Sequence, residues 1–240
     1  MLFRSDLFLA PSRFTLRAHR ERGFTRPMLH LPHFLAESDV VAAAGPAHPR
    51  PYALFVGRLE RIKGADRLIE AFRGYRGLDL LIAGDGEEGA DLRRQAEGLD
   101  HVHFLGRLSQ AQLAVLYKGA TALVVPSAGY EVFGLAVLEA FARRTPAVVH
   151  DLGALPELIE DSGGGLVYRT QDELVASLER LRAEEGLRDE LGGRGHDAWR
   201  RLWSEERHLD AYFAAIEQAQ SGKATSASGS SKSSGTSAIA

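Results

Sequence analysis

The feature that most constrains the fold of this chain is an alternation of short apolar runs with amphipathic segments. Apolar runs such as 122–125 lack the polar alternation of a half-exposed strand, and strands of that kind are buried on both faces of a parallel sheet. The predicted strands are 52–56, 79–83, 101–105, 122–125, 146–150 and 165–168, and the predicted helices are 64–73, 90–97, 109–117, 134–143, 155–160, 171–184, 187–192 and 205–220. The alternation predicts an α/β fold: a doubly wound, Rossmann-like parallel sheet with helices on both faces.

The chain is longer than one such domain needs, because its 240 residues exceed the usual single-domain length. Residues 50–203 hold the predicted domain. Residues 1–49 hold one further βα unit, too little to bury its own apolar faces, followed by a Pro- and Ala-rich linker; the alternative is that this unit adds strands to the main sheet. We expect a separate helix at 204–220 and a disordered Ser-rich tail at 221–240.

Composition excludes several classes of protein. The net charge of −3 provides no broad basic surface, so a nucleic-acid partner is not expected. The chain has no cysteine, which excludes disulfides, thiolate zinc sites and a cysteine nucleophile. Its nine histidines show no metal-ligand spacing. His101 and His103 are interpreted as packing or surface residues, and we predict no metal site.

A Gly-x-Gly-x-x-Gly pattern at 84–89 follows the predicted strand 79–83. Such a pattern can hold a pyrophosphate on helix amides, but Asp85, Glu87 and Glu88 would repel that ligand. We interpret the pattern as a tight strand-to-helix turn whose acids complement the helix dipole. An NAD(P)-dependent oxidoreductase, one alternative function, rests on this pattern alone.

Two glycines and two cations, Gly57, Arg58, Lys63 and Gly64, follow the first strand of the domain. Ligands of open α/β sheets bind outside the carboxyl ends of the strands, and Arg and Lys side chains both bind phosphate. The loop is therefore a candidate site for an anionic group. The alternative is a solvated basic turn that pairs with Glu60.

A second candidate loop follows the fourth predicted strand. The amides of Phe133, Gly134 and Leu135 would point into the same crevice, where amides at a helix start bind anions. Glu131 precedes the helix and Glu139 lies eight residues further on, so their carboxylates span about one nucleotide and can accept hydrogen bonds from vicinal hydroxyls. Alternatively, Glu131 complements the helix dipole and Glu139 lies at the surface, although a Glu in an apolar run requires a partner.

Taken in order, these motifs resemble the carboxyl-terminal, donor-binding half of a retaining GT-B glycosyltransferase of the group 1, or family 4, type. Arg144 stands where that family usually has glycine. The motifs that carry the resemblance are Gly57-Arg58 with Lys63-Gly64, Ala83-Gly84-Asp85-Gly86, Phe104-Leu105-Gly106, Pro126-Ser127, Glu131 to Glu139 with Phe133-Gly134, and Leu152-Gly153-Ala154-Leu155-Pro156-Glu157.

The resemblance implies a hexosyltransferase that moves a sugar from a nucleoside diphosphate sugar to an acceptor, with retention and without a metal. Arg58, Lys63 and Glu131 would be the catalytic residues. The nucleotide sugar is then a substrate, and no cofactor is expected. The residues implied to hold this donor are Gly57, Arg58, Lys63, Glu131, Phe133, Gly134, Leu135 and Glu139.

The resemblance also implies that most of an amino-terminal, acceptor-binding domain is missing, with 1–49 as its remnant and 204–220 as the helix that crosses back to it. The expected partners are the donor, a sugar, lipid or small-molecule acceptor, and a separate amino-terminal half. The alternative function is a catalytically incomplete nucleotide-sugar-binding subunit or fragment. The implied location is the cytoplasm, with peripheral placement at the inner membrane face as the alternative.

Overall fold

The computed structural model describes residues 5–40 and 48–229, with side chains up to residue 221. Its main body is a six-stranded sheet in which all neighbouring strands run parallel. In spatial order the strands are β5 (Val102–Gly106), β4 (Asp79–Ala83), β3 (Tyr52–Val56), β6 (Ala122–Val125), β7 (Ala147–His150) and β8 (Gly165–Tyr168). This order is that of a Rossmann-type doubly wound sheet. The predicted fold class is confirmed, and the strand bounds differ from the predicted ones by one residue at most.

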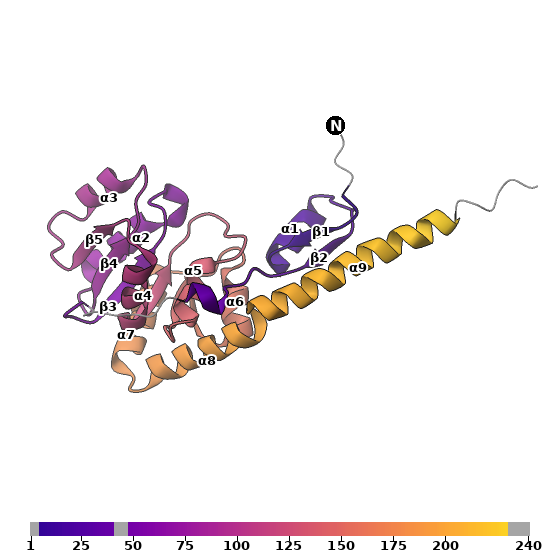
Figure 1. Ribbon diagram of the computed structural model, residues 1–240. Helices are drawn as coiled ribbons and strands as arrows, with labels where there is room; N and C mark the ends of the chain where they lie inside the picture. Colours follow the sequence, from indigo (N-terminus) through magenta and orange to yellow (C-terminus); the bar gives the residue numbers. More distant parts are fainter. Residues whose placement is uncertain (1–4, 41–47, 230–240) are drawn as a thin grey trace, which may run out of the picture.

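Helices cover both faces of the sheet (Figure 1). Successive strand residues point to opposite faces, so Ala53 and Phe55 enter one hydrophobic core while Tyr52 and Leu54 enter the other. The first core is completed by α2 (Ala65–Gly74), α3 (Gly89–Gln95) and α7 (Gln171–Ala183), and the second by α4 (Gln110–Gly119), α5 (Leu135–Phe141) and α6 (Leu155–Ser162). The two cores fix the sheet between two helical layers, which leaves the ends of the strands accessible.

The helix predicted to stop at Gly192 continues to form α8 (Leu187–Leu202). Glycine lowers helix propensity, so the sequence pattern ends too early. These glycines allow close packing instead: a Cβ on Gly192 would lie 2.1 Å from the carbonyl oxygen of Arg144, and one on Gly195 would lie 2.4 Å from the Phe141 ring. In the described part of the chain, Arg144 is also the one non-glycine residue with a positive φ, 56°, at the position where the resemblance leads one to expect glycine.

The residues before the main body form a small βαβ unit of their own. β1 (Phe8–Ala10) and β2 (Met28–His30) pair in parallel with each other, and α1 (Arg13–Glu21) connects them. The alternative that this unit adds strands to the main sheet is wrong, because the two strands form a separate sheet. One turn of 3-10 helix, η1 (Glu37–Asp39), follows. Residues 41–47, the Ala-rich part of the predicted linker, lie outside the described residues.

The last helix, α9 (Glu205–Gly229), runs along this small unit (Figure 1). The Nδ1 of His208 donates to the carbonyl oxygen of Pro32 over 2.8 Å. A hollow of about 250 Å³ lies between α9 and the start of β1, where Leu9 and Ile216 are among the lining residues. The helix predicted at 204–220 therefore packs against the unit at residues 5–31.

The structure differs from the expected tail, because α9 continues through 221–229. Adding residues to an existing helix is far easier than starting one, so the helix extends here although six of the nine residues are glycine, serine or threonine, which have lower helix propensity than alanine. Residues 230–240 lie outside the described residues. No helix among residues 5–40 and 48–229 has the length and apolar character needed to cross a bilayer.

Candidate functional site

A hollow lies where the strand order of the main sheet reverses. The chain passes from β3 to β4 on one side and from β6 to β7 on the other, and ligands of doubly wound sheets bind at such a switch point, outside the carboxyl ends of the strands. The hollow has a volume of about 410 Å³. Its lining includes all eight residues that the sequence singles out: Gly57, Arg58, Lys63, Glu131, Phe133, Gly134, Leu135 and Glu139. The fold thus brings together residues from two distant loops.

The two loops are joined to each other by their backbones. The loop after β3 contains one turn of 3-10 helix, η2 (Arg61–Lys63). The carbonyl oxygen of Ile62 accepts hydrogen bonds from the amides of Ala128 and Gly129 at 2.8 and 3.0 Å. Gly64, with a left-handed φ of 72°, makes this approach possible, because a Cβ there would lie 2.1 Å from the carbonyl oxygen of Pro126. The loops after β3 and β6 therefore form one hydrogen-bonded surface at the carboxyl ends of the strands.

The Gly-x-Gly-x-x-Gly turn packs against the backbone of the loop after β3. A Cβ on Gly84, whose φ is 143°, would lie 1.8 Å from the carbonyl oxygen of Gly57, and one on Gly86 would lie 2.5 Å from that of Leu59. The Leu59 amide donates to Asp85, and the Leu59 carbonyl accepts from the Glu88 amide at 3.0 Å. The glycines are thus explained by close packing, as the predicted tight turn requires.

Lys63 and Glu131 both line the hollow and contact each other there. The Nζ of Lys63 lies 2.7 Å from Oε1 of Glu131, and the hydroxyl of Ser127 donates to the same oxygen at 2.7 Å. The backbone of Glu131 is fixed as well, because its carbonyl accepts from the Ala154 amide at 3.0 Å and a Cβ on Gly153 would lie 2.8 Å from that oxygen. Sequence reasoning did not select Ser127 as a site residue.

Arg58 lies at the rim of the hollow. Its side chain is 71% exposed and forms an ion pair with Glu60. The alternative prediction of a solvated basic turn describes this pairing correctly. An exposed ion pair of this kind contributes little to stability, so Arg58 can turn toward a ligand at small cost.

Glu139 finds its partner on the neighbouring helix. The hydroxyl of Tyr117 in α4 donates to its Oε2 at 2.6 Å, and Tyr117 is 1% exposed. Burial, and next the charge of Glu139, hold the pKa of the Tyr117 phenol well above its usual value, so Tyr117 remains a neutral donor. The Arg143 guanidinium lies 5.5 Å from the centre of the Tyr117 ring. The apolar surroundings of Glu139 in the sequence indicated a partner, but they did not identify it.

Backbone amides and an imidazole complete the wall beside α5. The amides of Phe133, Gly134 and Leu135 have no backbone acceptor among the described residues. His33, which follows β2, packs its ring edge-to-face on Phe133 with centroids 5.4 Å apart. Burial, and then the charge of His208, lower the pKa of His33, which favours its neutral form. No local sequence signal marks His33, because only the fold brings it to the hollow.

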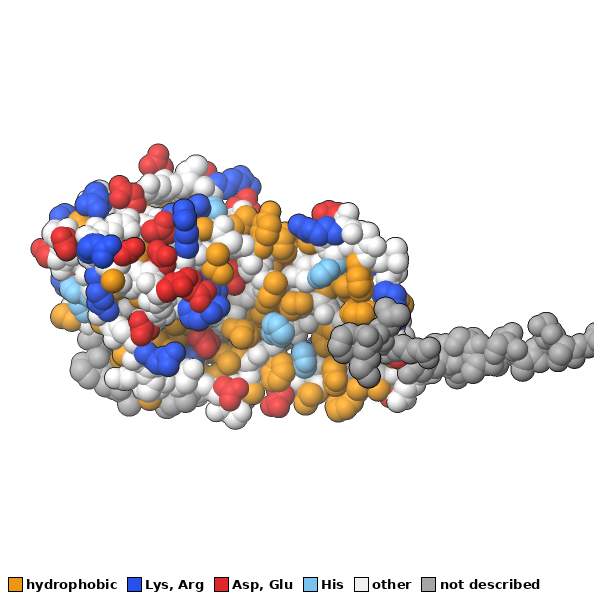
Figure 2. All heavy atoms as spheres, turned by 90° about the horizontal axis from the view of Figure 1, so that it is seen from above, with side chains coloured by type: hydrophobic (Ala, Val, Ile, Leu, Met, Phe, Trp, Pro, Cys, Tyr) orange, Lys and Arg blue, Asp and Glu red, His pale blue; other side chains and the backbone are white. Residues whose placement is uncertain are grey.

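Charge is not uniform over the surface around this edge. On the face shown in Figure 2, Lys, Arg, Asp and Glu side chains are dense over the main sheet, whereas hydrophobic side chains gather toward the small unit and α9. The large hydrophobic side chains that are exposed include Leu9, Tyr130, Val132, Leu135 and Phe213. Two of these exposed side chains, Val132 and Leu135, line the hollow.

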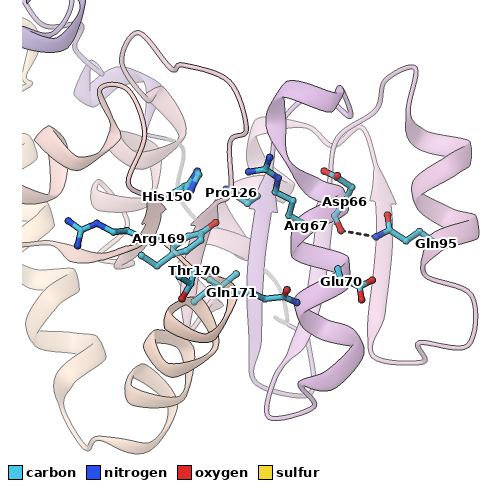
Figure 3. A pocket seen from close by; sticks show the side chains of 11 residues that line it. Asp66, Arg67, Glu70, Gln95, Pro126, His150, Arg169, Thr170 and Gln171 are labelled. Atoms are coloured by element: carbon cyan, nitrogen blue, oxygen red, sulfur yellow. Dashed lines mark hydrogen bonds between the residues drawn. The ribbon is translucent and has the colours of Figure 1, made fainter.

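A second hollow, of about 350 Å³, lies between α2 and the start of α7 (Figure 3). Its lining includes Arg67 and Arg169 but also Asp66 and Glu70, so opposite charges cancel there. One wall is fixed by the Gln95 side chain, which donates to the Asp66 carbonyl at 2.8 Å. None of the eight predicted residues lines it.

Comparison with known proteins gives concordant results. A sequence model of the family described as glycosyl transferases group 1 matches residues 39–197. The phosphatidyl-myo-inositol mannosyltransferase of Mycobacterium leprae is 36% identical over 160 residues, which are 63% of this chain and 42% of that protein. The D-inositol 3-phosphate glycosyltransferase of Actinosynnema mirum is 35% identical over 187 residues, or 69% of this chain and 44% of that protein. These matches span less than half the length of either relative.

Solved structures agree with the fold. The sucrose-phosphate synthase of Thermosynechococcus elongatus superposes with a TM-score of 0.78 at 26% identity, over 91% of this chain and 59% of that one. Anabaena HepE in complex with UDP and glucose superposes with a TM-score of 0.76 at 17% identity, over 89% of this chain and 64% of that one. At that lower identity the second likeness concerns the fold alone.

Proposed function

The chain belongs to the glycosyl transferases group 1 family, and on that premise we propose that the hollow between the loops after β3 and β6 binds a nucleoside diphosphate sugar as the donor for glycosyl transfer. The observation that carries this proposal is the convergence of two cations, two carboxylates and three backbone amides in one hollow at the switch point of the sheet. Anionic and hydroxyl groups of one ligand would find complementary partners there.

The diphosphate would lie against Lys63 and Arg58. Lys63 is 24% exposed and is paired with Glu131, so an arriving phosphate would compete with a carboxylate for the same ammonium group. As the bond to the sugar breaks, negative charge grows on the leaving phosphate, and cations placed there stabilise that charge. Because Lys63, Arg58 and the amides before α5 supply this positive charge, we propose a metal-independent transfer.

The sugar and the ribose would be held by the two glutamates. Glu131 lies beside the amides of Phe133 and Gly134, where its carboxylate can accept from sugar hydroxyls. Glu139, held by Tyr117, would accept from the ribose hydroxyls. We extend the proposal to retention at the anomeric carbon, on the basis of the family resemblance that the order of the motifs carries. From the same resemblance we propose that the reaction takes place in the cytoplasm or at the inner membrane face.

Complete transfer also needs an acceptor site. The acceptor is a sugar, a lipid or a small molecule. His33, which follows β2, lines the hollow, which supports a contribution of this segment to the donor side. Because the chain spans under half the length of its curated relatives, the second candidate function is a donor-binding subunit that requires a separate amino-terminal half. Adding that half in trans restores turnover in the second case.

Calorimetric titration with UDP, GDP and ADP at fixed salt tests the proposal, with NADH as the control ligand. The diphosphates should bind more tightly than their nucleosides, and Lys63→Ala should remove most of that difference. Arg61→Ala is a matched control, because Arg61 lies in the same loop but outside the lining of the hollow. Binding of NADH alone, or equal losses for nucleoside and diphosphate, would overturn the assignment.

A further inference from the structure

A second cluster of polar side chains lies at the opposite edge of the main sheet. Asp79 is the first residue of β4, His103 belongs to β5, and His48 precedes β3 in the chain. We propose that His48, Asp79 and His103 form a binding site for a divalent transition-metal ion such as Zn²⁺. The donor set, two imidazoles and one carboxylate, is one that zinc prefers.

The ligand atoms are already close together. Oδ2 of Asp79 lies 2.6 Å from Nε2 of His48 and 3.4 Å from Nε2 of His103, and one ligand atom from each residue lies within 4.8 Å of the others. Tetrahedral zinc, with bonds near 2.0–2.1 Å, separates its ligand atoms by roughly 3.3 Å. Small side-chain movements would therefore admit the ion, mainly by opening the His48 contact.

The carboxylate of Asp79 lacks full compensation of its charge. Its side chain is 3% exposed, and a buried carboxylate is costly unless it is paired and hydrogen-bonded. Its Oδ1 has no hydrogen bond in the described structure. The Nη1 of Arg50 lies 3.2 Å away, but that side chain is 60% exposed. A dication held between Asp79 and the two imidazoles would give this carboxylate a further cationic partner.

The two imidazoles are oriented by packing. The His48 ring lies edge-to-face on Tyr52 at 5.7 Å between centroids, and the His48 and His103 rings are 5.1 Å apart. Tyr52 is itself fixed, since its hydroxyl donates to the Leu116 carbonyl at 2.7 Å. The side chains of His48 and His103 are 20% and 36% exposed, so an ion can enter from solvent and a water can take a fourth position.

The position of the cluster defines the role of the metal. The hollow is built on the carboxyl ends of the strands, whereas Asp79 starts β4 at the amino end. The ion would join the segment before β3 to two strands of the sheet. It would therefore act on stability and would not take part in glycosyl transfer.

The test is titration of the untagged, chelator-treated chain with Co²⁺, followed by visible absorbance, and with Zn²⁺, followed by calorimetry. We expect one saturable equivalent, a cobalt ligand-field band and a raised melting temperature with Zn²⁺. Removing a ligand should weaken Zn²⁺ binding by more than the roughly 10- to 100-fold that loss of an outer-sphere partner costs.

Three variants decide the outcome. Asp79→Asn and His103→Gln should each lose the cobalt band, while His19→Gln, an exposed histidine on α1, should keep it. If Asp79→Asn fails to fold, His103→Gln alone suffices, because that side chain is partly exposed. No saturable binding, or equal binding by His103→Gln and the unchanged chain, would overturn the proposal; His48 and Asp79 would then simply share a hydrogen bond.

Discussion

The Nζ of Lys63 lies 2.7 Å from Oε1 of Glu131, although the two residues are 68 positions apart in the chain. Each comes from the loop that follows a central strand, and the hydrogen bonds between those loops hold the pair in place. A ligand phosphate would compete with Glu131 for Lys63. The same contact would release the carboxylate toward the hydroxyls of a donor sugar.

Replacing Lys63 with Ala should weaken diphosphate binding about tenfold to a hundredfold, because a hydrogen bond to a charged group contributes roughly 1.5–3 kcal/mol. Nucleoside affinity should change far less. Calorimetry of UDP and uridine on Lys63→Ala, Arg58→Ala and the control Arg61→Ala measures the difference. Equal affinity changes in all three variants would contradict a specific role for Lys63 and Arg58.

Glu139 should discriminate ribose from deoxyribose. In Glu139→Ala, a nucleoside diphosphate and its 2′-deoxy form should bind with similar affinity, because the acceptor of the ribose hydroxyls is gone. Tyr117→Phe should reduce the same discrimination and lower the free energy of unfolding by about 1 kcal/mol, because the partly buried Glu139 carboxylate loses its donor. Paired titrations with the two ligands give the answer. A deoxy penalty that survives in Glu139→Ala would place the ribose elsewhere.

The left-handed backbone at Gly64 should be indispensable for the joined loops. Alanine at a left-handed position costs roughly 1–2 kcal/mol in any case, and here the new Cβ would also meet the carbonyl of Pro126 at 2.1 Å. Gly64→Ala should therefore lose more stability than that and lose diphosphate binding too. Gly23→Ala is the matched control, because Gly23 has a similar φ of 83° and its Cβ would meet nothing within 4 Å. Urea unfolding of both variants compares the losses.

Arg13 should fasten the small βαβ unit to the main body. Its guanidinium contacts Asp161 at 2.8 Å and Glu160 at 3.2 Å, and its amide donates to Glu157 at 2.9 Å. Because the side chain is 39% exposed, solvent screening limits its contribution to about 1 kcal/mol. Arg13→Ala should raise hydrogen exchange in α1 without changing the main sheet. Arg22→Ala, which loses only a contact within α1, should leave exchange at the contact with α6 unaltered.

The free energy of unfolding should fall at high pH, because a buried phenol ionises more readily in the unfolded chain than in the folded one. Burial raises the pKa of Tyr52 to about 12, above the unfolded value near 10. The neutral phenol therefore favours the folded state fully below about pH 10, and this contribution is lost as the pH rises toward 12. Urea midpoints measured from about pH 8 to about pH 11 should decline, with a smaller decline in Tyr52→Phe. A flat profile in the unchanged chain would contradict the burial of Tyr52.

Short-range pattern was sufficient for the sheet and for the selection of the eight residues of the hollow. Parallel strands place their loops at one edge whatever their distance in the chain, so Lys63 and Glu131 could be selected together. The residues that contact these site residues through tertiary packing could not be predicted from the order of strands and loops. Tyr117 reaches Glu139 from another helix, and His33 reaches Phe133 from the small unit.

The failures of prediction have a common physical origin. The sequence pattern predicts too early an end for α8, because the low helix propensity of glycine is visible in the sequence, whereas the close approach of Gly192 and Gly195 to Arg144 and Phe141 is not. The proximity of His48, Asp79 and His103 could not be read from the sequence either, since these residues come from a segment before β3, from β4 and from β5. Spacing along the chain reveals residues that meet on one helix or strand, whereas these contacts join residues from several helices and strands.

The contact between α9 and the small βαβ unit can form only late in synthesis, because α9 lies near the end of the described chain. The Pro32 carbonyl is made 176 residues before the His208 ring that binds it. At about 5–20 residues per second, a ribosome takes roughly 9 to 35 s to cover that interval. The strands of the main sheet, β3 to β8, are all made within that interval, while β1 and β2 wait for the helix that packs along them. The nascent chain therefore leaves the face of this unit that α9 covers unpaired for longer than any part of the main core.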